Sequence, residues 1–517
     1  MADRSAIRFL LGHELQEVRN CDPQTTVLDW LRGAAGRKGT KEGCAEGDCG
    51  ACTVTVAELH ENQLRYRAVN SCIQLLPMLD GRQLISVEDL ASDDPVSPQL
   101  HPVQQAMVDQ HGSQCGFCTP GFVMSLFTLF HDPRAIQNKA IDLAKQEIDL
   151  TRQEMDAVLA GNLCRCTGYA PIVKAARQAL AHASAGDAFS QREADTQQQL
   201  QQIVRTDPLA LEFQGRRFFA PRELPHLWQI LQEHPDARMV AGATDVGLWI
   251  TKQLQQFTTL VYVGEVRELQ RLQPLRENGG LEIGAAVRYV DALPRLLESY
   301  PELADMMQRL GAEQVRNAGT IGGNIANGSP IGDMPPALIA LDASLLLSSS
   351  TGSRELALED FFIKYGKQDL QPGECVEAIR LPPRPTGLHY RVYKLSRRFD
   401  QDISSLCGAF SLRLEGDEII EPRICFGGMA GTPRRASAAE HALRGQAWTL
   451  ERVQAAQQAL LEDFEPLTDW RGSSAYRMQA AQNLLLRFYL ETQEQSPGHF
   501  PVHFPGQFPV QLQRGNV

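Results

Sequence analysis

Long apolar runs are missing from this chain. No part of its 517 residues approaches the ~20 consecutive apolar residues that a membrane-spanning helix requires. The short apolar run Phe9–Leu11 cannot serve as the core of a secretory signal, and no cleavage pattern follows it. We therefore expect a cytoplasmic protein that does not cross a membrane.

Positive charge is also in deficit. The chain has 62 acidic and 50 basic residues, which gives a net charge of -12. Nucleic acids bind basic surfaces that displace their counterions, and an anionic membrane surface repels an acidic protein. We expect neither as a partner. The hydrophobic content of 43% is that of a globular protein, and a single core stops growing near ~250–300 residues, so several domains are expected.

Cysteine, in contrast, is abundant and unevenly placed. Eight of the 12 cysteines fall between Cys44 and Cys166. Without a route to an oxidising compartment, such clustering favours metal or cluster ligation over a disulfide framework. The other four are isolated, and we expect them to be small buried apolar side chains: Cys21, Cys375, Cys407 and Cys425.

The first cysteine group has the spacing of a plant-type [2Fe-2S] site. Three cysteines crowd a glycine-rich loop and a fourth follows after nineteen residues: Cys44, Cys49, Cys52 and Cys72. Glycines within the loop allow backbone N–H groups to turn toward an anionic centre. Tetrahedral zinc is the alternative, but zinc sites normally use two paired knuckles, so the spacing favours the cluster.

The second group consists of two close pairs near expected helix ends: Cys115, Cys118, Cys164 and Cys166. The helix expected after Cys118 would place its positive end near a negatively charged cluster. Alone, Cys115-x-x-Cys118 would suit a redox dithiol of the thioredoxin type. The second pair argues against a redox dithiol. Zinc is also disfavoured, because the single residue between Cys164 and Cys166 directs the two thiolates poorly for a tetrahedral ion.

Hydrophobic patterning divides the chain into regions. The N-terminal pattern predicts a β-grasp unit with strands around Gly12, at 51–59 and at 64–69, and a helix at 27–32. Helices are then expected at 87–90, 103–110, 122–130, 136–159 and 172–183. Residues 181–206 lack apolar periodicity, which predicts an exposed linker. Strands and helices alternate after residue 207, and the tail from residue 495 is rich in Pro, Phe and Gln.

The two cysteine motifs together resemble those of the xanthine oxidase family of molybdenum hydroxylases. The resemblance implies a multidomain α+β protein with a β-grasp ferredoxin domain, a four-helix second [2Fe-2S] domain, a two-part FAD-binding domain and a C-terminal α+β domain. The boundaries expected on this basis are 1–85, 86–183, a linker at 184–206, 207–385, 386–494 and a tail at 495–517.

Two later segments carry the flavin part of the resemblance. Neither contains the Gly-x-Gly-x-x-Gly fingerprint of a Rossmann fold. The first is similar to an FAD-binding segment of the family over Arg238, Met239, Val240, Ala241, Gly242, Ala243, Thr244 and Asp245. In the second and downstream of it, cofactor positions fall on Thr320, Asn324, Asp333, Val376 and Lys394. The family has an aromatic residue where this chain has Leu310. No histidine precedes the motifs as a covalent flavin link requires, so we expect noncovalent FAD.

The resemblance implies an electron-transfer subunit rather than one that activates substrate, and no catalytic residue is assigned. A separate molybdenum-cofactor subunit would oxidise hypoxanthine or xanthine to urate, and electrons would pass through both clusters to FAD and then NAD. A heterotetramer of two small and two large subunits is expected. The equivalent subunit of an aldehyde or other N-heterocycle molybdenum dehydrogenase is the alternative, because the substrate pocket would lie outside these motifs.

Overall fold

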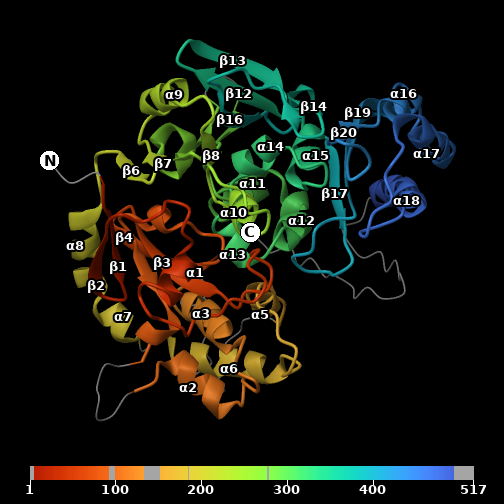
Figure 1. Cartoon of the computed structure of the whole chain (residues 1–517). Coiled ribbons are helices and arrows are strands. Elements are labelled where there is room, and N and C mark those ends of the chain that lie inside the picture. The colour runs from red at the N-terminus through yellow and green to blue at the C-terminus, as the bar shows by residue number, and fades with distance from the viewer. Residues whose placement is uncertain (1–4, 92–98, 133–151, 184–185, 276–278, 494–517) are drawn as a thin grey trace. The chain divides into compact units, whose positions relative to one another are not determined.

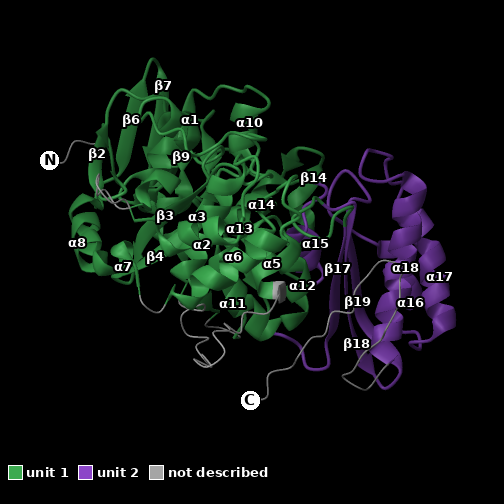
Figure 2. Ribbon diagram, turned by 90° about the horizontal axis from the view of Figure 1, so that it is seen from below, with its two compact units in different colours: residues 1–329, 342–383, 396–403 green, residues 330–341, 384–395, 404–517 purple. Residues whose placement is uncertain are grey.

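The computed structural model describes residues 5–91, 99–132, 152–183, 186–275 and 279–493 (Figure 1). The chain divides into two compact units, which Figure 2 colours separately. The first contains residues 1–329, 342–383 and 396–403, and the second contains 330–341, 384–395 and 404–517. In the described parts, no helix has the length and apolar character needed to span a membrane.

A five-stranded sheet opens the first unit. Its order is β2-β1-β5-β3-β4, formed by Glu14–Val18, Ile7–Leu11, Gln83–Ile85, Thr53–His60 and Gln63–Asn70. Helix α1, Val27–Arg32, begins at Thr26, whose side-chain oxygen accepts a hydrogen bond from the Asp29 N–H. Its Trp30 ring packs edge-on against Phe9, with centroids 5.1 Å apart. The mixed sheet with one helix confirms the β-grasp prediction.

Four described helices follow the sheet: α2 Pro102–Asp109, α3 Thr119–Phe130, α5 Arg152–Leu159 and α6 Ala170–Ala181. Helix α3 is buried from Gly121 to Phe130 because it packs against the other helices and against β3. The helical prediction for residues 136–151 lies outside the described residues. The helix expected at 87–90 is a short 3-10 helix, Val87–Asp89.

The expectation of an exposed linker at 181–206 is wrong. Helices α7, Ala188–Gln191, and α8, Glu193–Ile203, follow α6. Leu200 and Ile203 lie on one face of α8 and are buried against Leu10. Glutamine is a good helix former, so a narrow apolar stripe suffices to hold this polar segment as a helix against the sheet. The tail from residue 495 lies outside the described residues.

The rest of the first unit is built around two sheets, in agreement with the two-part α+β prediction. One has the order β6-β7-β9-β8, from Leu209–Phe213, Arg216–Ala220, Thr259–Tyr262 and Arg238–Val240, with α9 (Leu224–Glu233) and α10 (Val246–Thr251). The other, β10-β11-β16-β12-β13, is formed by Leu272–Pro274, Leu281–Gly284, Cys375–Leu381, Ser344–Ser349 and Gly352–Ala357. Its helices are α11 Tyr289–Ser299, α12 Ala304–Arg309, α13 Glu313–Arg316 and α14 Ile321–Asn327, and a small hairpin joins β14 Phe362–Lys364 to β15 Lys367–Gln368.

The second unit is an antiparallel sheet covered by helices. Strands β17 His389–Leu395, β18 Leu406–Glu415, β19 Glu418–Gly427 and β20 Arg434–Arg435 pair in sequence order. The helices are α15 Met334–Ile339, α16 Ser437–Leu443, α17 Leu450–Asp463 and α18 Ser474–Gln493. Phe410, Phe426 and Phe488 fill the core. The C-terminal α+β unit agrees with the sequence, whereas the inclusion of residues 330–341 was not expected. The domain boundaries themselves stay predictions.

Candidate cofactor sites

The first cysteine group converges at the loop before β3 and the turn after β4. The Cys44 backbone N–H donates to the Cys49 sulfur at 3.3 Å, and the Cys49 N–H donates to the Cys44 sulfur at the same distance. Cys52 and Cys72 are both 2% exposed, and their sulfurs form a second hydrogen-bonded pair. The four sulfurs therefore lie as two pairs, Cys44 with Cys49 and Cys52 with Cys72.

Each pair is arranged to carry negative charge. The hydrogen bond from Cys49 lowers the pKa of Cys44 to about 5, against the opposing effect of burial, and nearby backbone N–H groups add to the lowering. In the same way Cys72 lowers the pKa of Cys52, while the pKa values of Cys49 and Cys72 are raised. One thiolate in each pair is thus stabilised by its surroundings, as a site for an anionic cluster requires.

The second cysteine group has the same paired arrangement at the ends of α3 and α6. Hydrogen bonds couple Cys118 with Cys164 and Cys115 with Cys166. The Cys164 backbone N–H donates to the Tyr169 hydroxyl at 2.9 Å, and Tyr169 adopts a left-handed φ of 67° before α6. Cys115 and Cys166 are exposed, whereas Cys118 and Cys164 are partly buried.

The arrangement of the four sulfurs at each place agrees with a two-iron centre. Four thiolates on one tetrahedral zinc, at Zn–S distances near 2.3 Å, would all lie about 3.8 Å from one another. In a [2Fe-2S] cluster each iron takes two of the four thiolates, which separates them into two pairs. The structure brings together all eight predicted ligands in this paired form. Of the isolated cysteines, Cys375, Cys407 and Cys425 are buried, as expected.

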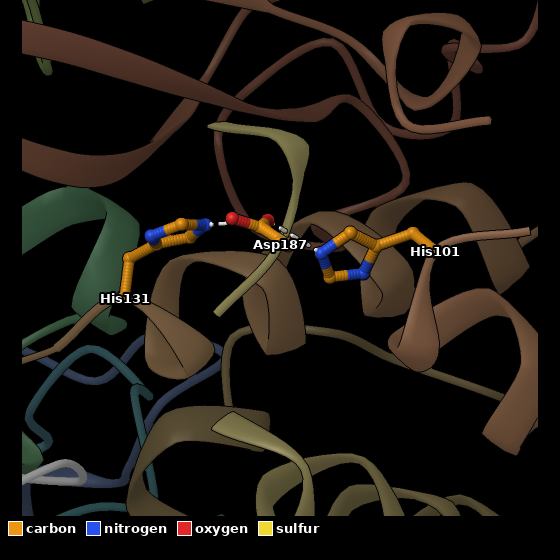
Figure 3. A group of neighbouring side chains, drawn as sticks. All are labelled: His101, His131 and Asp187. Carbon is orange, nitrogen blue, oxygen red and sulfur yellow. Dashed lines mark hydrogen bonds and ion pairs between the residues drawn. The ribbon is translucent and has the colours of Figure 1, made fainter. Parts of the chain in front are cut away.

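One other group of possible metal ligands occurs in the described residues, at His101, His131 and Asp187 (Figure 3). Both imidazole Nε2 atoms contact Asp187 Oδ2, at 2.8 and 3.0 Å. His101 Nδ1 accepts the Val103 N–H at 3.2 Å, so its proton is on Nε2. Nε2 then donates to Asp187 and has no lone pair for a metal. The hydrogen bonds of this group hold the start of α7 against the helices α2 and α3.

The two cysteine loops touch each other directly. The Leu163 backbone N–H, next to Cys164, donates to the Cys49 carbonyl at 2.9 Å. Gly50 lies so close to Gly161 that a Cβ added at Gly50 would overlap the Gly161 carbonyl oxygen, and one added at Gly121 would overlap the Gly50 carbonyl. Only glycine fits at these positions, and the two sites are thereby joined by backbone contact.

The first cysteine loop also contacts the helix that follows the first flavin segment. The Thr251 hydroxyl of α10 donates to the Ala45 carbonyl at 2.8 Å. At the other end of α10, a Cβ added at Gly247 would lie 2.7 Å from the Ile73 carbonyl oxygen, beside Cys72. The second cysteine group, the first group and α10 are therefore connected in that order.

The two flavin segments of the first unit lie against each other. Gly242 packs so tightly against Ala318 and Gly319 that it has no room for a Cβ. Thr320 starts α14, and its side-chain oxygen accepts the Gly323 N–H at 2.9 Å. Asn324 Oδ1 is buried without a hydrogen-bond partner among the described residues, as expected of a group that binds a ligand.

One further feature of the first segment is consistent with a built site. Ala243 has a φ of 60°, a conformation that costs about 1–2 kcal/mol in an alanine and is typical of ligand-binding turns. Asp245, at the N-terminus of α10, is exposed. Downstream, Val376 lies in β16 and is buried. Leu310, at the position where the family has an aromatic residue, is 8% exposed and contributes an aliphatic surface.

Asp333 and Lys394 lie in the second unit, where they form a buried pair. The Lys394 ammonium donates to Asp333 Oδ2 at 2.6 Å and to the Ser404 hydroxyl at 2.7 Å, and Ser404 donates to Asp333 Oδ1 at 2.5 Å. Lys394 is 3% exposed, so it does not belong to a solvated basic face. A role of the pair toward FAD stays a prediction.

A cavity of about 910 Å³ borders Ala241, Gly242 and Thr320 on one side and strands β3 and β4 on the other. Its wall holds five arginines and five acidic residues, so it has no net charge. At its centre Glu58 Oε1 accepts from Arg67 Nε at 2.9 Å, and Glu58 also pairs with Arg82 and Arg288. No sequence pattern predicts this ion network, because its members are far apart along the chain.

Four family descriptions match successive parts of the chain. They are a 2Fe-2S iron-sulfur cluster binding domain (12–75), a [2Fe-2S] binding domain (86–177), an FAD binding domain in molybdopterin dehydrogenase (211–384) and a CO dehydrogenase flavoprotein C-terminal domain (391–492). A solved carbon monoxide dehydrogenase from Hydrogenophaga pseudoflava is 31% identical, with a TM-score of 0.50, over 52% of this chain and 94% of that chain. The chain belongs to the xanthine oxidase family of molybdenum hydroxylases.

Curated members of this molybdenum hydroxylase family include the xanthine dehydrogenases of Emericella nidulans and Drosophila pseudoobscura pseudoobscura. They are 29% and 30% identical to this chain over 93% of its length. The chain spans about two fifths of their length, 38% and 39% respectively. Two 2Fe-2S domains, an FAD-binding domain and a flavoprotein C-terminal domain are thus established for this oxidoreductase family member.

Proposed function

We propose that this chain is the electron-transfer part of a xanthine dehydrogenase. It would take electrons from a molybdenum-cofactor subunit that oxidises hypoxanthine or xanthine to urate, and deliver them through its two clusters to FAD and then NAD. When bound, a [2Fe-2S] cluster carries single electrons, and a flavin links one-electron to two-electron transfer. The chain's own residues would hold these groups along one path, from the second cysteine group to the first and then to the flavin.

The observation that carries the proposal is the order of contacts in the first unit. Leu163, beside Cys164, donates to Cys49 in the first loop. That loop in turn accepts a hydrogen bond from Thr251 of α10, which directly follows Asp245 of the first flavin segment. Short backbone contacts therefore join the second cysteine group, the first group and the flavin segment.

The proposed FAD site rests on the residues that the structure assembles around Gly242. We propose that the backbone from Arg238 to Asp245 and the side chains of Thr320 and Asn324 hold FAD without a covalent bond, with Asp333, Val376 and Lys394 as further contacts. The buried, unpartnered Asn324 Oδ1 and the tight Gly242–Ala318 contact support this proposal. Acid precipitation should release the flavin, and yellow colour retained in the pellet would contradict it.

The substrate, the acceptor and the partner are proposed from the relatives' names. Xanthine dehydrogenases match along 93% of this chain. The chain matches about two fifths of the length of those proteins. We propose that the molybdenum chemistry is supplied by a separate large subunit, in a heterotetramer of two small and two large subunits. The protein would act in the cytoplasm.

Reversed electron flow tests the proposed function. The purified chain, loaded with iron, sulfide and FAD, should let NADH bleach the flavin and reduce a one-electron dye, with no turnover of xanthine. Addition of the molybdenum-containing subunit should couple xanthine oxidation to NAD reduction. Failure of NADH to bleach the flavin would contradict NAD as the acceptor, and xanthine turnover by the chain alone would contradict the division between subunits.

A second function is favoured by the structural comparison. The similar solved protein is a carbon monoxide dehydrogenase described as lacking the Mo-pyranopterin moiety of its molybdenum cofactor. The same electron-transfer part would therefore suit an aldehyde, N-heterocycle or other molybdenum dehydrogenase. Identification of the molybdenum protein that co-purifies with this chain, and of the substrate it oxidises, distinguishes the two functions.

A further inference from the structure

A buried polar cluster lies where the two cysteine loops meet. It consists of Thr53, Ser125, Asn162 and Gln314, which we call the inter-loop cluster. Asn162, 1% exposed, donates through Nδ2 to the Gly50 carbonyl at 3.0 Å and to the Thr53 hydroxyl at 3.2 Å. Its Oδ1 accepts from the Ser125 hydroxyl at 2.6 Å. Asn162 thus fixes the segment before Cys164 to the loop that carries Cys49 and Cys52.

Gln314 is the one member that comes from the flavin-binding region. It lies in α13, three residues before Asn317, where the second flavin segment begins. Its side chain is 1% exposed, and Nε2 lies 3.1 Å from Ser125 Oγ, 3.2 Å from Thr53 Oγ1 and 3.3 Å from Asn162 Oδ1. The amide of Gln314 therefore contacts all three other members of the cluster.

The inter-loop cluster surrounds a backbone link between the two proposed iron–sulfur sites. That link is the hydrogen bond from the Leu163 N–H to the Cys49 carbonyl, 2.9 Å long, which joins a ligand of the first site to the residue that precedes Cys164 of the second. Asn162 immediately precedes Leu163, and its bond to Gly50 lies beside the link. The position of the Leu163 N–H, and so the length of the link, depends on how firmly the side chain of the adjacent Asn162 is held.

We propose that Gln314 is a positioning residue for electron transfer between the two clusters. By sharing its two amide N–H groups among Asn162 Oδ1, Ser125 Oγ and Thr53 Oγ1, it holds the Leu163–Cys49 link at its observed length. This proposal rests on the proposed electron-transfer function and adds to it that the flavin-binding region sets the coupling between the clusters. Gln314 touches no cluster ligand, so the spectrum of each cluster should not depend on it.

The test compares Gln314→Met with the wild-type protein. Methionine keeps the volume and removes the donor, so Asn162 is held less firmly while both sets of cysteines remain. We expect about tenfold slower electron equilibration between the clusters after pulse reduction, since small errors of position have large effects on rate. Both cluster EPR signals and the iron content should be unchanged. Gln308→Met, at an exposed glutamine of α12, is the matched control and should behave like wild type.

Substitutions of Thr53 provide a second test of the proposal if the Gln314→Met variant does not retain iron. Thr53→Ser keeps the hydroxyl that Gln314 and Asn162 contact and should equilibrate at the wild-type rate, whereas Thr53→Val should be slower. Wild-type rates in iron-loaded Gln314→Met, or equal rates in the two Thr53 variants, would overturn the proposal. Absence of two clusters from the wild-type protein would instead contradict the proposed function itself.

Discussion

Replacement of Gly50 by alanine should separate the two cysteine loops. Gly50 has a φ of 68°, and a Cβ there would overlap the Gly161 carbonyl oxygen and lie 2.7 Å from Asn162 Nδ2. The left-handed backbone costs an alanine about 1–2 kcal/mol. Forcing the two backbones apart costs about 1–3 kcal/mol more, as in other overpacked sites. We expect a loss of about 2–5 kcal/mol in unfolding free energy, together with loss of iron.

Gly116→Ala is the matched control for this prediction. Gly116 lies in the second cysteine loop with a φ of 83°, and a Cβ there would meet nothing within 4 Å. Alanine at this position has the backbone cost without the overlap, so it should lose only about 1–2 kcal/mol. Urea unfolding of both variants under anaerobic conditions, with iron content measured in parallel, gives the difference between them. Equal losses in the two variants would refute the argument that close contact between the loops requires Gly50.

Three further predictions concern the other groups of the first unit. Asp187→Asn should lower the unfolding free energy by about 2 kcal/mol near pH 7, since it removes an acceptor for His101 and His131. Hydrogen bonds from these histidines lower the pKa of Asp187 despite its burial. The difference between wild type and variant in urea titrations should therefore be present above about pH 4 and should shrink below it. Glu58→Ala leaves three arginines without their shared carboxylate and should cost about 3–5 kcal/mol in unfolding free energy. The control Glu61→Ala, at an exposed residue, should cost less than about 0.5 kcal/mol. An equally small loss of unfolding free energy in both variants would contradict the role of the ion network. Asn324→Leu should weaken FAD binding about tenfold, measured by flavin titration, with iron content unchanged, and unaltered affinity would exclude Asn324 from the site.

Local patterns were sufficient to predict the cysteine sites and much of the fold. Ligand spacing is a local property, and Cys44-x4-Cys49-x2-Cys52 is specific because few other sites require three thiolates in one loop. The helix at Val27–Arg32 and the strands around Gly12 were predicted for the same reason, since alternation and capping are encoded within a few residues.

Tertiary contacts decided what the sequence could not predict. Residues Glu193–Ile203 form a helix held in place because Leu200 and Ile203 pack against Leu10, nearly two hundred residues earlier in the chain. Gln314 and Asn162 are ordinary polar residues in the sequence, and only burial next to Thr53 and Ser125 gives them a role. The assignment of Asp333 and Lys394 to one buried pair likewise depends on the fold of the second unit.

The pairing of the cysteines also required coordinates. Spacing alone identifies eight ligands but does not show which sulfurs lie together. The structure places Cys44 with Cys49, Cys52 with Cys72, Cys118 with Cys164 and Cys115 with Cys166.

Spin quantitation of the reduced protein tests the central claim most directly. The protein should be purified without oxygen, reduced with dithionite and examined by low-temperature EPR. Two paired-thiolate sites in different surroundings predict about two spins per chain in two distinct [2Fe-2S] signals, with about four iron atoms per chain. Cys49→Ser should then remove one signal and Cys164→Ser the other. One spin per chain, or stoichiometric zinc in place of iron, would contradict the account.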